Sequence, residues 1–383
     1  MKKILSLILS LCVVFSSICA SANATSEVGK AASESLSESS TEPKVYELSL
    51  EQAIAMAYEN NGELKANQLD QKGKNLSVTS ANLSKKELKD ITLNPAKNFD
   101  MYCVKKGYYL KAAKVQAELS KGQAEQIKSR IAYDVTEAYY KYVLVQKLAS
   151  AAQNAYELAT ENFALVSAQY DMGLISKLDY ENAAISVKMA ENALLSYKMN
   201  CKTAEQNLKI LIHKDEEDCT IKVSDYVDCS DYSSDVEADI KSAMESRYDI
   251  TALKKSAELA YEYFDVADVL TSTSAMYHTA YASYVKADYD YSNTKKLIAL
   301  LISTSYNSIL TAKADMDTAK LSYEMKVKQN DSAKLKYELG MITNLELTQS
   351  INELYESQTQ YANAKVTYRL AVEKYKKEIT VGL

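Results

Sequence analysis

A long apolar seam runs through the middle of the chain. From Ile127 to Tyr170, apolar or tyrosine side chains recur at alternating steps of three and four residues. This spacing keeps them on one face of a helix and is typical of a coiled coil. The pattern therefore predicts a long helix from near Cys103 to Tyr170. The seam positions are Ile127, Ile131, Val135, Ala138, Tyr142, Val145, Ala149, Ala152, Tyr156, Ala159, Phe163, Val166 and Tyr170.

A second seam of the same kind predicts a second long helix, from near Ser274 to Tyr337. At a rise of 1.5 Å per residue, each long helix would measure about 100 Å. Tyrosine is common on both seams, and we interpret it as a core residue whose hydroxyl group reaches water. The second seam has three polar entries and consists of Ile298, Ile302, Ser305, Ile309, Ala312, Met316, Ala319, Tyr323, Lys326, Asn330, Ala333 and Tyr337.

The chain is one unit repeated twice. Residues 170–178 read YDMGLISKL and residues 337–345 read YELGMITNL, an offset of 167. Residues 50–66 and 236–252 also align, at an offset of 186. The first copy therefore carries additional residues between the two matching regions, and we place them in the loop 91–107, which holds Pro95 and Gly107.

The glycines of the repeated motif predict tight reversals. Gly173 and Gly340 would end the long helices, because glycine adopts the left-handed backbone that such turns need. Returning helices follow at residues 177–212 and 344–380. Asp179 or Ser176 is suited to cap the first returning helix, and Thr343 or Asn344 the second.

The N-terminal segment predicts export. Lys2 and Lys3 precede an apolar run at residues 4–18, and Ala22, Asn23 and Ala24 form a small-residue cleavage pattern. We read residues 1–24 as a secretory signal peptide cleaved after Ala24. The Ser/Glu-rich residues 25–45 are expected to form a disordered leader.

The remaining chain divides at an acidic segment. The first helical repeat is expected over residues 46–212 and the second over 236–383. Between them, residues 213–235 predict an acidic connecting loop with one short strand at 220–223.

Composition supports an all-α fold. The 383 residues include only 2 Pro and 8 Gly, and no proline follows Pro95. Chains so poor in turn residues do not form β-sandwiches or propellers, whereas long helices require the near absence of interior proline. The formal net charge of -6 argues against nucleic-acid binding, which needs a basic face.

Candidate chemistry is sparse. Cys219 and Cys229 could form a disulfide in an exported protein, and free thiols are the alternative. The two histidines, His213 and His278, lie far apart without the carboxylate or cysteine spacing of a metal site. No nucleotide-binding, nucleophile-elbow or zinc-protease motif occurs. We therefore expect no metal, no cofactor and no enzyme activity.

Through three features taken together, the chain resembles the TolC-like outer membrane efflux protein family. They are the opening LSLEQAIAMAYENNGELKA, the reversals YDMGLISKLD and YELGMITNLE, and the duplication. The resemblance covers residues 46–380. It implies a homotrimer whose long helices form a hollow α-barrel in the cell envelope. It also implies efflux with a membrane-fusion-type adaptor and an inner-membrane transporter.

One departure separates the chain from that family. Family members carry membrane strands between the short second helix and the long third helix of each repeat. Here the helical pattern continues through residues 265–288, and only residues 271–274 look like a turn. The sequence thus predicts the helical tunnel without the spanning strands that place the family in the outer membrane. The alternative is a structural or surface coiled-coil envelope protein that forms no channel.

The resemblance also implies functional residues. The reversal tips would contact the adaptor through Gly173, Leu174 and Ile175 in the first copy and Gly340, Met341 and Ile342 in the second. The alternative is that both glycines serve only as turn formers.

A further position would line the tunnel. Glu346 lies six residues after Gly340, where the family carries an acidic residue at the pore constriction. The family's second acidic position is Gln349 here. Alternatively, Glu346 is a first-turn carboxylate that complements the helix dipole.

Overall fold

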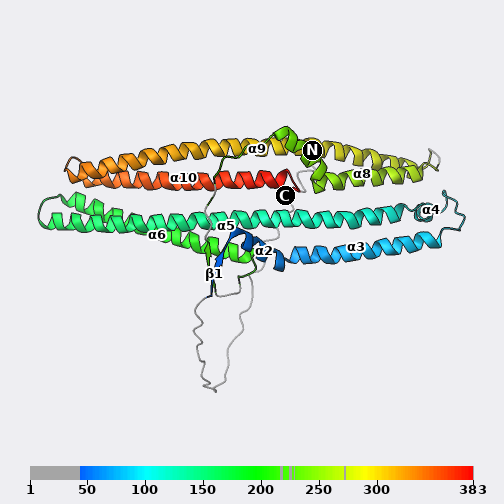
Figure 1. Cartoon of the computed structure of the whole chain (residues 1–383), viewed down its shortest axis with the longest axis horizontal. Coiled ribbons are helices and arrows are strands. Elements are labelled where there is room, and N and C mark those ends of the chain that lie inside the picture. Colours follow the sequence, from blue (N-terminus) through cyan, green and yellow to red (C-terminus); the bar gives the residue numbers. More distant parts are fainter. Residues whose placement is uncertain (1–43, 216–218, 224–226, 228, 271–272, 383) are drawn as a thin grey trace, which may run out of the picture. The chain divides into compact units, whose positions relative to one another are not determined.

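The computed structural model describes residues 44–215, 219–223, 227, 229–270 and 273–382, which belong to one unit, Pro43–Leu383 (Figure 1). The predicted signal peptide and nearly all of the predicted leader lie outside these residues. The described elements follow the order β1 (Lys44–Leu48), α2 (Leu50–Asn60), α3 (Gly62–Glu87), α4 (Phe99–Lys106), α5 (Tyr108–Asp171), α6 (Lys177–Leu211), β2 (Cys219–Val223), α7 (Val236–Ser246), α8 (Tyr248–Ala267), α9 (Ala275–Glu338) and α10 (Asn344–Glu378).

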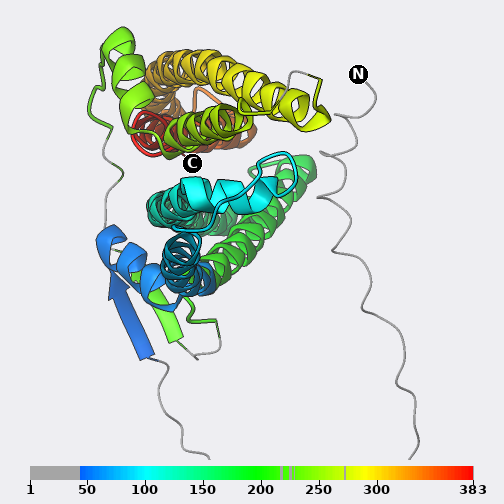
Figure 2. The same cartoon turned by 90° about the vertical axis from the view of Figure 1, so that its right-hand side faces the viewer.

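The helices form two copies of one arrangement. The long helices α5 and α9 both have 64 residues, and the returning helices α6 and α10 both have 35. Each long helix packs against its returning helix and against a helix before it, α3 on α5 and α8 on α9. Figure 2, seen along the helices, shows the two copies as neighbouring bundles joined by contacts of α5 with α8 and α10. The expected all-α fold is confirmed.

The predicted seams are the packing faces of the long helices. Every seam position on both helices is buried or half-buried. Two of the three polar entries on α9 have partners on α10: the Lys326 ammonium lies 2.6 Å from the Glu353 carboxylate, and the Asn330 amide donates to Ser350. The irregularities of the second seam are therefore compatible with the same packing.

A two-stranded parallel sheet lies beside the first copy. Strand β1 pairs with β2 in a register that places Lys44 opposite Cys219 and Leu48 opposite Val223. The short strand predicted at residues 220–223 is confirmed. Its partner was not foreseen, and it begins at Lys44, inside the segment expected to be leader.

Tyrosine hydroxyl groups hold these strands on α5. The Tyr139 hydroxyl donates to the carbonyl of Leu48 at 2.9 Å, and the Tyr142 hydroxyl donates to the carbonyl of Ile221 at 2.8 Å. Both rings are buried. Of these two tyrosines, only Tyr142 is a seam position. The interpretation of seam tyrosines with water-facing hydroxyls is wrong there, because its hydroxyl satisfies a buried backbone carbonyl.

The connections that precede the long helices lie together at one end of the unit, at the right of Figure 1. Residues 88–98 join α3 to α4, and residues 268–274 join α8 to α9. The described residues of both connections contain no strand. Phe99 and Cys103 of α4 pack with Ala267 and Ala280 in one buried cluster. The helical pattern expected through residues 265–288 is thus interrupted by a short break.

The cysteines of the described residues carry thiols rather than disulfides. The bridge suggested by the spacing of Cys219 and Cys229 is not present, because the two side chains face different partners. The Cys219 thiol lies 4.0 Å from the carbonyl of Lys214, and the Cys229 thiol lies 3.8 Å from the carbonyl of Lys365 on α10.

Candidate functional site at the helix reversals

The first reversal is closed by backbone hydrogen bonds. Gly173 has a φ of 74°, in the left-handed region. Its N–H donates to the carbonyl of Tyr170 at 2.8 Å, and the N–H of Leu174 donates to the carbonyl of Gln169 at 2.9 Å. This pair of bonds is a Schellman motif, which satisfies carbonyls that a helix end leaves open.

The second reversal has the same geometry. Gly340 has a φ of 69°, and its N–H donates to the carbonyl of Tyr337 at 2.9 Å. The N–H of Met341 donates to the carbonyl of Lys336 at 2.8 Å. A Cβ atom on either glycine would meet no other atom within 4 Å, so the backbone angle alone demands glycine.

Hydroxyl side chains start the returning helices. The Ser176 hydroxyl accepts the N–H of Asp179 at 3.1 Å, and the Thr343 hydroxyl accepts the N–H of Glu346 at 3.3 Å. One residue of each predicted pair of caps, Ser176 for α6 and Thr343 for α10, is therefore the observed N-cap.

The predicted contact residues differ in what they expose. Leu174 and Met341 are 69% and 71% exposed. Ile175 and Ile342 are half-buried. The leucine and methionine are thus the side chains that the reversals present to a partner, while the isoleucines pack partly against the hairpins.

Four more exposed apolar side chains extend this surface, and the sequence reasoning missed them. The offset of 167 that relates Leu174 to Met341 also relates these residues in pairs, so extending the repeat alignment would have found them. We call the whole set the tip surface. It comprises Met172, Leu174, Leu178, Leu339, Met341 and Leu345.

The two reversals lie at the same end of the unit, at the left of Figure 1. The Asn162 amide of α5 donates to the Asn344 side-chain oxygen of α10 at 2.7 Å, which joins the two hairpins close to their tips. The tip surface thus gathers apolar side chains of both copies at one end of the helices.

Glu346 takes part in a capping box. Its carboxylate accepts the Thr343 N–H at 2.8 Å and the Thr343 hydroxyl at 3.1 Å. These bonds from the backbone and then the hydroxyl of Thr343 lower the pKa of the Glu346 carboxyl below its usual 4.5. The geometry accounts for Glu346 as a helix-start residue, and its role at a pore constriction stays a prediction.

The described residues contain no candidate metal-binding cluster. Across the described residues, no group of three or more His, Cys, Asp or Glu side chains is placed to hold an ion.

Comparisons with known proteins agree on the fold. Residues 106–212 match the family described as outer membrane efflux protein. The outer membrane protein VceC of Vibrio cholerae is 14% identical with a TM-score of 0.69, over 87% of this chain and 96% of that one. The CmeC outer membrane channel of Campylobacter jejuni is 14% identical with a TM-score of 0.66, over 86% and 85%.

The open MtrE outer membrane channel of Neisseria gonorrhoeae is 13% identical with a TM-score of 0.62, over 87% of this chain and 89% of that one. No curated protein sequence matches this chain. The expected resemblance to the TolC-like family is confirmed, and two of these similar structures, CmeC and MtrE, are described as outer membrane channels.

Proposed function

We propose that this chain, whose residues 106–212 match the outer membrane efflux protein family, is the tunnel-forming component of a TolC-like efflux complex. The observation that carries the proposal is the pair of equal hairpins, each with a 64-residue helix and a 35-residue return. Hairpins of equal length that lie side by side can form the wall of a helical tunnel. The transported substrate would pass through its bore.

A single chain leaves much apolar surface uncovered, which supports assembly. On α9, Leu297, Leu300 and Leu321 are 56%, 61% and 67% exposed. This helix also contains a stretch apolar enough to cross a membrane by length and composition, only 22% of which is buried. Exposed apolar surface of this extent usually marks an interface. We propose that it is covered by neighbouring copies in a homotrimer, the number that the family resemblance suggests.

The tip surface is the proposed docking site of a membrane-fusion-type adaptor, which would connect the tunnel to an inner-membrane transporter. Six exposed apolar side chains there come from two reversals with the same backbone. Within one chain, the long helices do not pack over the tip surface, so its six side chains stay exposed. The place of work would be the cell envelope, after export directed by residues 1–24.

Assembly can be tested on the exported form of the chain, which begins at Thr25. Light scattering should find three copies, and electron microscopy should show a hollow ring in end views. A monomer throughout the micromolar range, or a solid bundle, would reject the tunnel and favour a structural coiled-coil protein.

Adaptor docking can be tested separately. The double substitution Leu174→Glu and Met341→Glu should abolish binding of the adaptor from the same organism without changing helicity. The matched control is Leu69→Glu with Leu76→Glu, two side chains of similar exposure on α3, and it should bind as the unaltered chain does. Export that survives the tip substitutions would rule out the contact role.

A further inference from the structure

An open groove lies between α8, α9 and the first part of α5, in the half of the unit that does not contain the reversals. It encloses a cavity of about 420 Å³, which is within the size range of small-molecule sites. Its aromatic lining is Tyr261 of α8 with Tyr284 and Tyr291 of α9. We call it the tyrosine groove.

Two of these tyrosine rings meet at an angle and form a corner. The ring centroids of Tyr261 and Tyr284 lie 5.3 Å apart, and the ring planes are inclined by 67°. Phe264 lies 6.1 Å from Tyr284 with its ring nearly parallel, which packs Tyr284 in place. Tyr261 is 51% exposed, so much of its ring is open to a ligand.

The aromatic side chains continue along α9 beyond the groove. Tyr277, Tyr281, Tyr284 and Tyr291 follow one another at steps of four, three and seven residues, which places them on one face of the helix. From the first to the last they span about 21 Å at a rise of 1.5 Å per residue. Tyr281 is 49% exposed and lies beside the ring of Phe264. A row of this length suits an extended chain better than a single small molecule.

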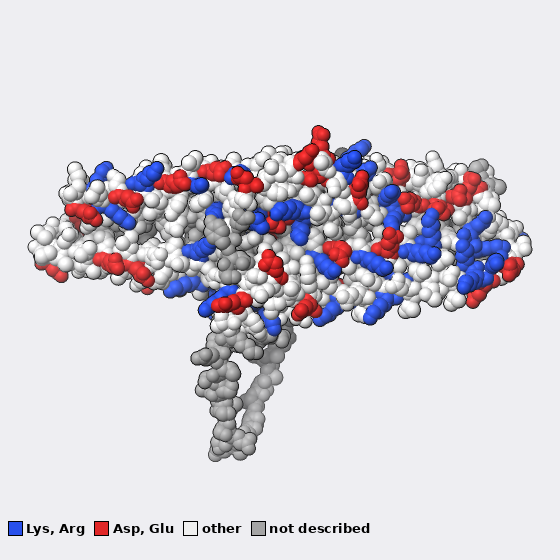
Figure 3. All heavy atoms as spheres, viewed as in Figure 1, with Lys and Arg blue, Asp and Glu red and all other residues white. Residues whose placement is uncertain are grey.

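Charges around the tyrosine groove nearly balance. Lys111 of α5 pairs with Glu262 of α8. Within the described part of the chain, the exposed side chains of Lys254, Glu258 and Asp288 make no ion pair. Figure 3 shows acidic side chains interspersed with basic ones over this right-hand half of the unit. The groove therefore offers hydrogen-bond donors and acceptors without favouring an ion of either sign.

Aliphatic side chains are nearly absent from the groove. Among the lining residues that the structure describes, the buried Ala257 is the only one. A peptide helix that docks in a groove needs aliphatic or aromatic pockets for several anchors, and an acyl chain needs an aliphatic lining. A sugar ring fits the lining better. Its C–H groups pack on the negative face of an aromatic ring, and its hydroxyls bond to carboxylates and ammonium groups.

We propose that the tyrosine groove binds an unbranched, β-linked polysaccharide. One sugar ring stacks on Tyr261 at the corner with Tyr284, its hydroxyls donate to Glu258 and Asp288, and the following sugars run along the row past Tyr281. A β-linked chain is flat and extended, so successive rings can face a straight row, whereas an α-linked chain coils away from it. Such binding would anchor the exported chain to a glycan of the cell envelope, and it does not require an assembled tunnel.

The test uses the exported form of the chain and soluble oligosaccharides. Titration calorimetry should detect binding of chitohexaose, a β-linked hexamer, at an affinity roughly fivefold or more above that of the α-linked maltohexaose. Because the aromatic row is longer than the groove, chitohexaose should also bind more tightly than chitotriose.

Variants separate the groove from the row beyond it. Tyr261→Ala should weaken binding of both chitotriose and chitohexaose by roughly tenfold, because it removes the open ring of the corner. Tyr261→Phe should restore most of the affinity, since it keeps that ring. Tyr281→Ala should weaken binding of chitohexaose and leave chitotriose unchanged, because Tyr281 lies outside the groove.

The matched control is Tyr289→Ala, since Tyr289 is 66% exposed on α9 but does not line the groove. It should bind both oligosaccharides as the unaltered chain does. Absence of chitohexaose binding would overturn the proposal, as would equal affinity for maltohexaose or equal losses in Tyr261→Ala and Tyr289→Ala. A change of oligomeric state in Tyr261→Ala would instead assign the groove to a second copy and would also overturn it.

Discussion

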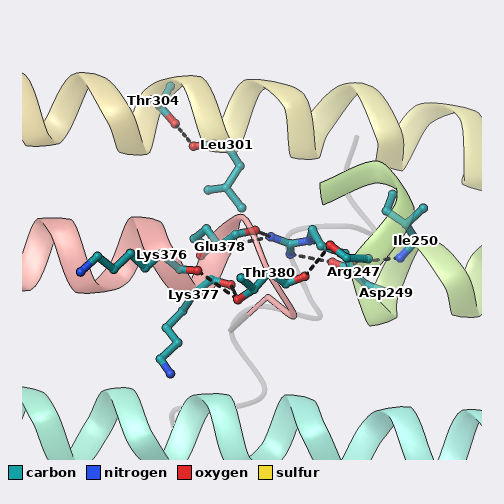
Figure 4. A network of polar contacts seen from close by, with 10 residues as sticks. Arg247, Asp249, Ile250, Leu301, Thr304, Lys376, Lys377, Glu378 and Thr380 are labelled. Carbon is teal, nitrogen blue, oxygen red and sulfur yellow. Dashed lines mark hydrogen bonds and ion pairs between the residues drawn. The ribbon is translucent and has the colours of Figure 1, made fainter. Parts of the chain in front are cut away.

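One guanidinium nitrogen of Arg247 donates to the side-chain carboxylate of Glu378 at 2.7 Å and to that residue's own carbonyl at 2.6 Å (Figure 4). The other two nitrogens donate to Asp249 at 3.0 and 2.7 Å. Burial lowers the pKa of Arg247, but the hydrogen bonds that it donates to Asp249 and Glu378 outweigh this effect and raise the pKa overall. This pairing joins the α7–α8 junction to the end of α10 and so closes the second copy.

Arg247→Met should destabilise the protein by about 3–5 kcal/mol, because it leaves the buried carboxylate of Glu378 without its partner. Urea unfolding followed by circular dichroism at one protein concentration would measure the loss. The control is Lys286→Met, which breaks an exposed pair with Asp290 and should cost under about 1 kcal/mol. Adding Glu378→Leu to Arg247→Met should recover part of the stability. Equal losses at Arg247 and Lys286 would contradict the buried-pair account.

Tyr142→Phe should cost about 1–3 kcal/mol, because the carbonyl of Ile221 loses a buried donor. Burial also raises the pKa of Tyr142 above its usual value, so its hydroxyl stays a donor at neutral pH. In Tyr142→Phe, amide hydrogen exchange should accelerate relative to the unaltered protein, and the acceleration should be larger at residues 219–223 than elsewhere in the chain. Tyr156→Phe is the comparison, since that half-buried seam tyrosine makes no such bond to a strand. If both changes behaved alike, the hydroxyl would not hold the strand.

Gly173→Ala and Gly340→Ala should each destabilise the protein by about 1–2 kcal/mol. In the left-handed conformation the Cβ atom of an alanine lies too close to the following carbonyl oxygen. Gly73→Ala is the matched change inside α3, where a Cβ has open space, and it should stabilise the helix by about 0.5–1 kcal/mol. Thermal unfolding of the three variants would compare them. Stabilisation at the two turns would mean that the reversals can form without left-handed residues.

The Glu346→Gln variant should lose less stability than the unaltered protein when the pH is lowered. A carboxyl whose pKa is lowered on folding stabilises the fold fully above its unfolded pKa, and this contribution is lost as pH falls through the folded pKa. The pKa of Glu346 is lowered from 4.5, so the difference between the two proteins should develop as pH falls below about that value. Thermal unfolding as a function of pH measures it. A constant difference between the two proteins at all pH values would contradict the sign of the shift.

The same substitution tests the pore role, because glutamine preserves the cap. Gln52 occupies the equivalent place in the capping box of α2, where its side chain accepts the N–H of Ser49 at 3.0 Å. A reconstituted tunnel with Glu346→Gln should therefore stay folded and lose preference for cations. Unchanged ion selectivity would leave Glu346 as a helix-start residue only.

Local patterns were enough to predict the long elements. The three-and-four spacing from Ile127 to Tyr170 marks a helix face regardless of its partner, and Gly173 and Gly340 need a left-handed backbone that few other residues adopt. The sequence also limited each cap of a returning helix to two candidates. The structure selects Ser176 and Thr343, whose hydroxyls bond a backbone N–H only three positions away. Four of the six tip-surface residues were missed, although the offset of 167 between the two copies relates them in pairs.

Contacts between distant segments were decided only by the tertiary structure. The pairing of β1 with β2 joins residues such as Lys44 and Cys219, and neither strand is stable in water without its partner and the helix that covers it. The burial of Arg247 depends on where α10 ends, and no spacing in the sequence relates it to Glu378. The sequence by itself thus determined the helices, reversals and caps, because their hydrogen bonds close within a few residues. The strand pairing, the state of the cysteines and the tip surface depend on side chains brought together across the chain. A pattern along the sequence does not contain the distances between such side chains.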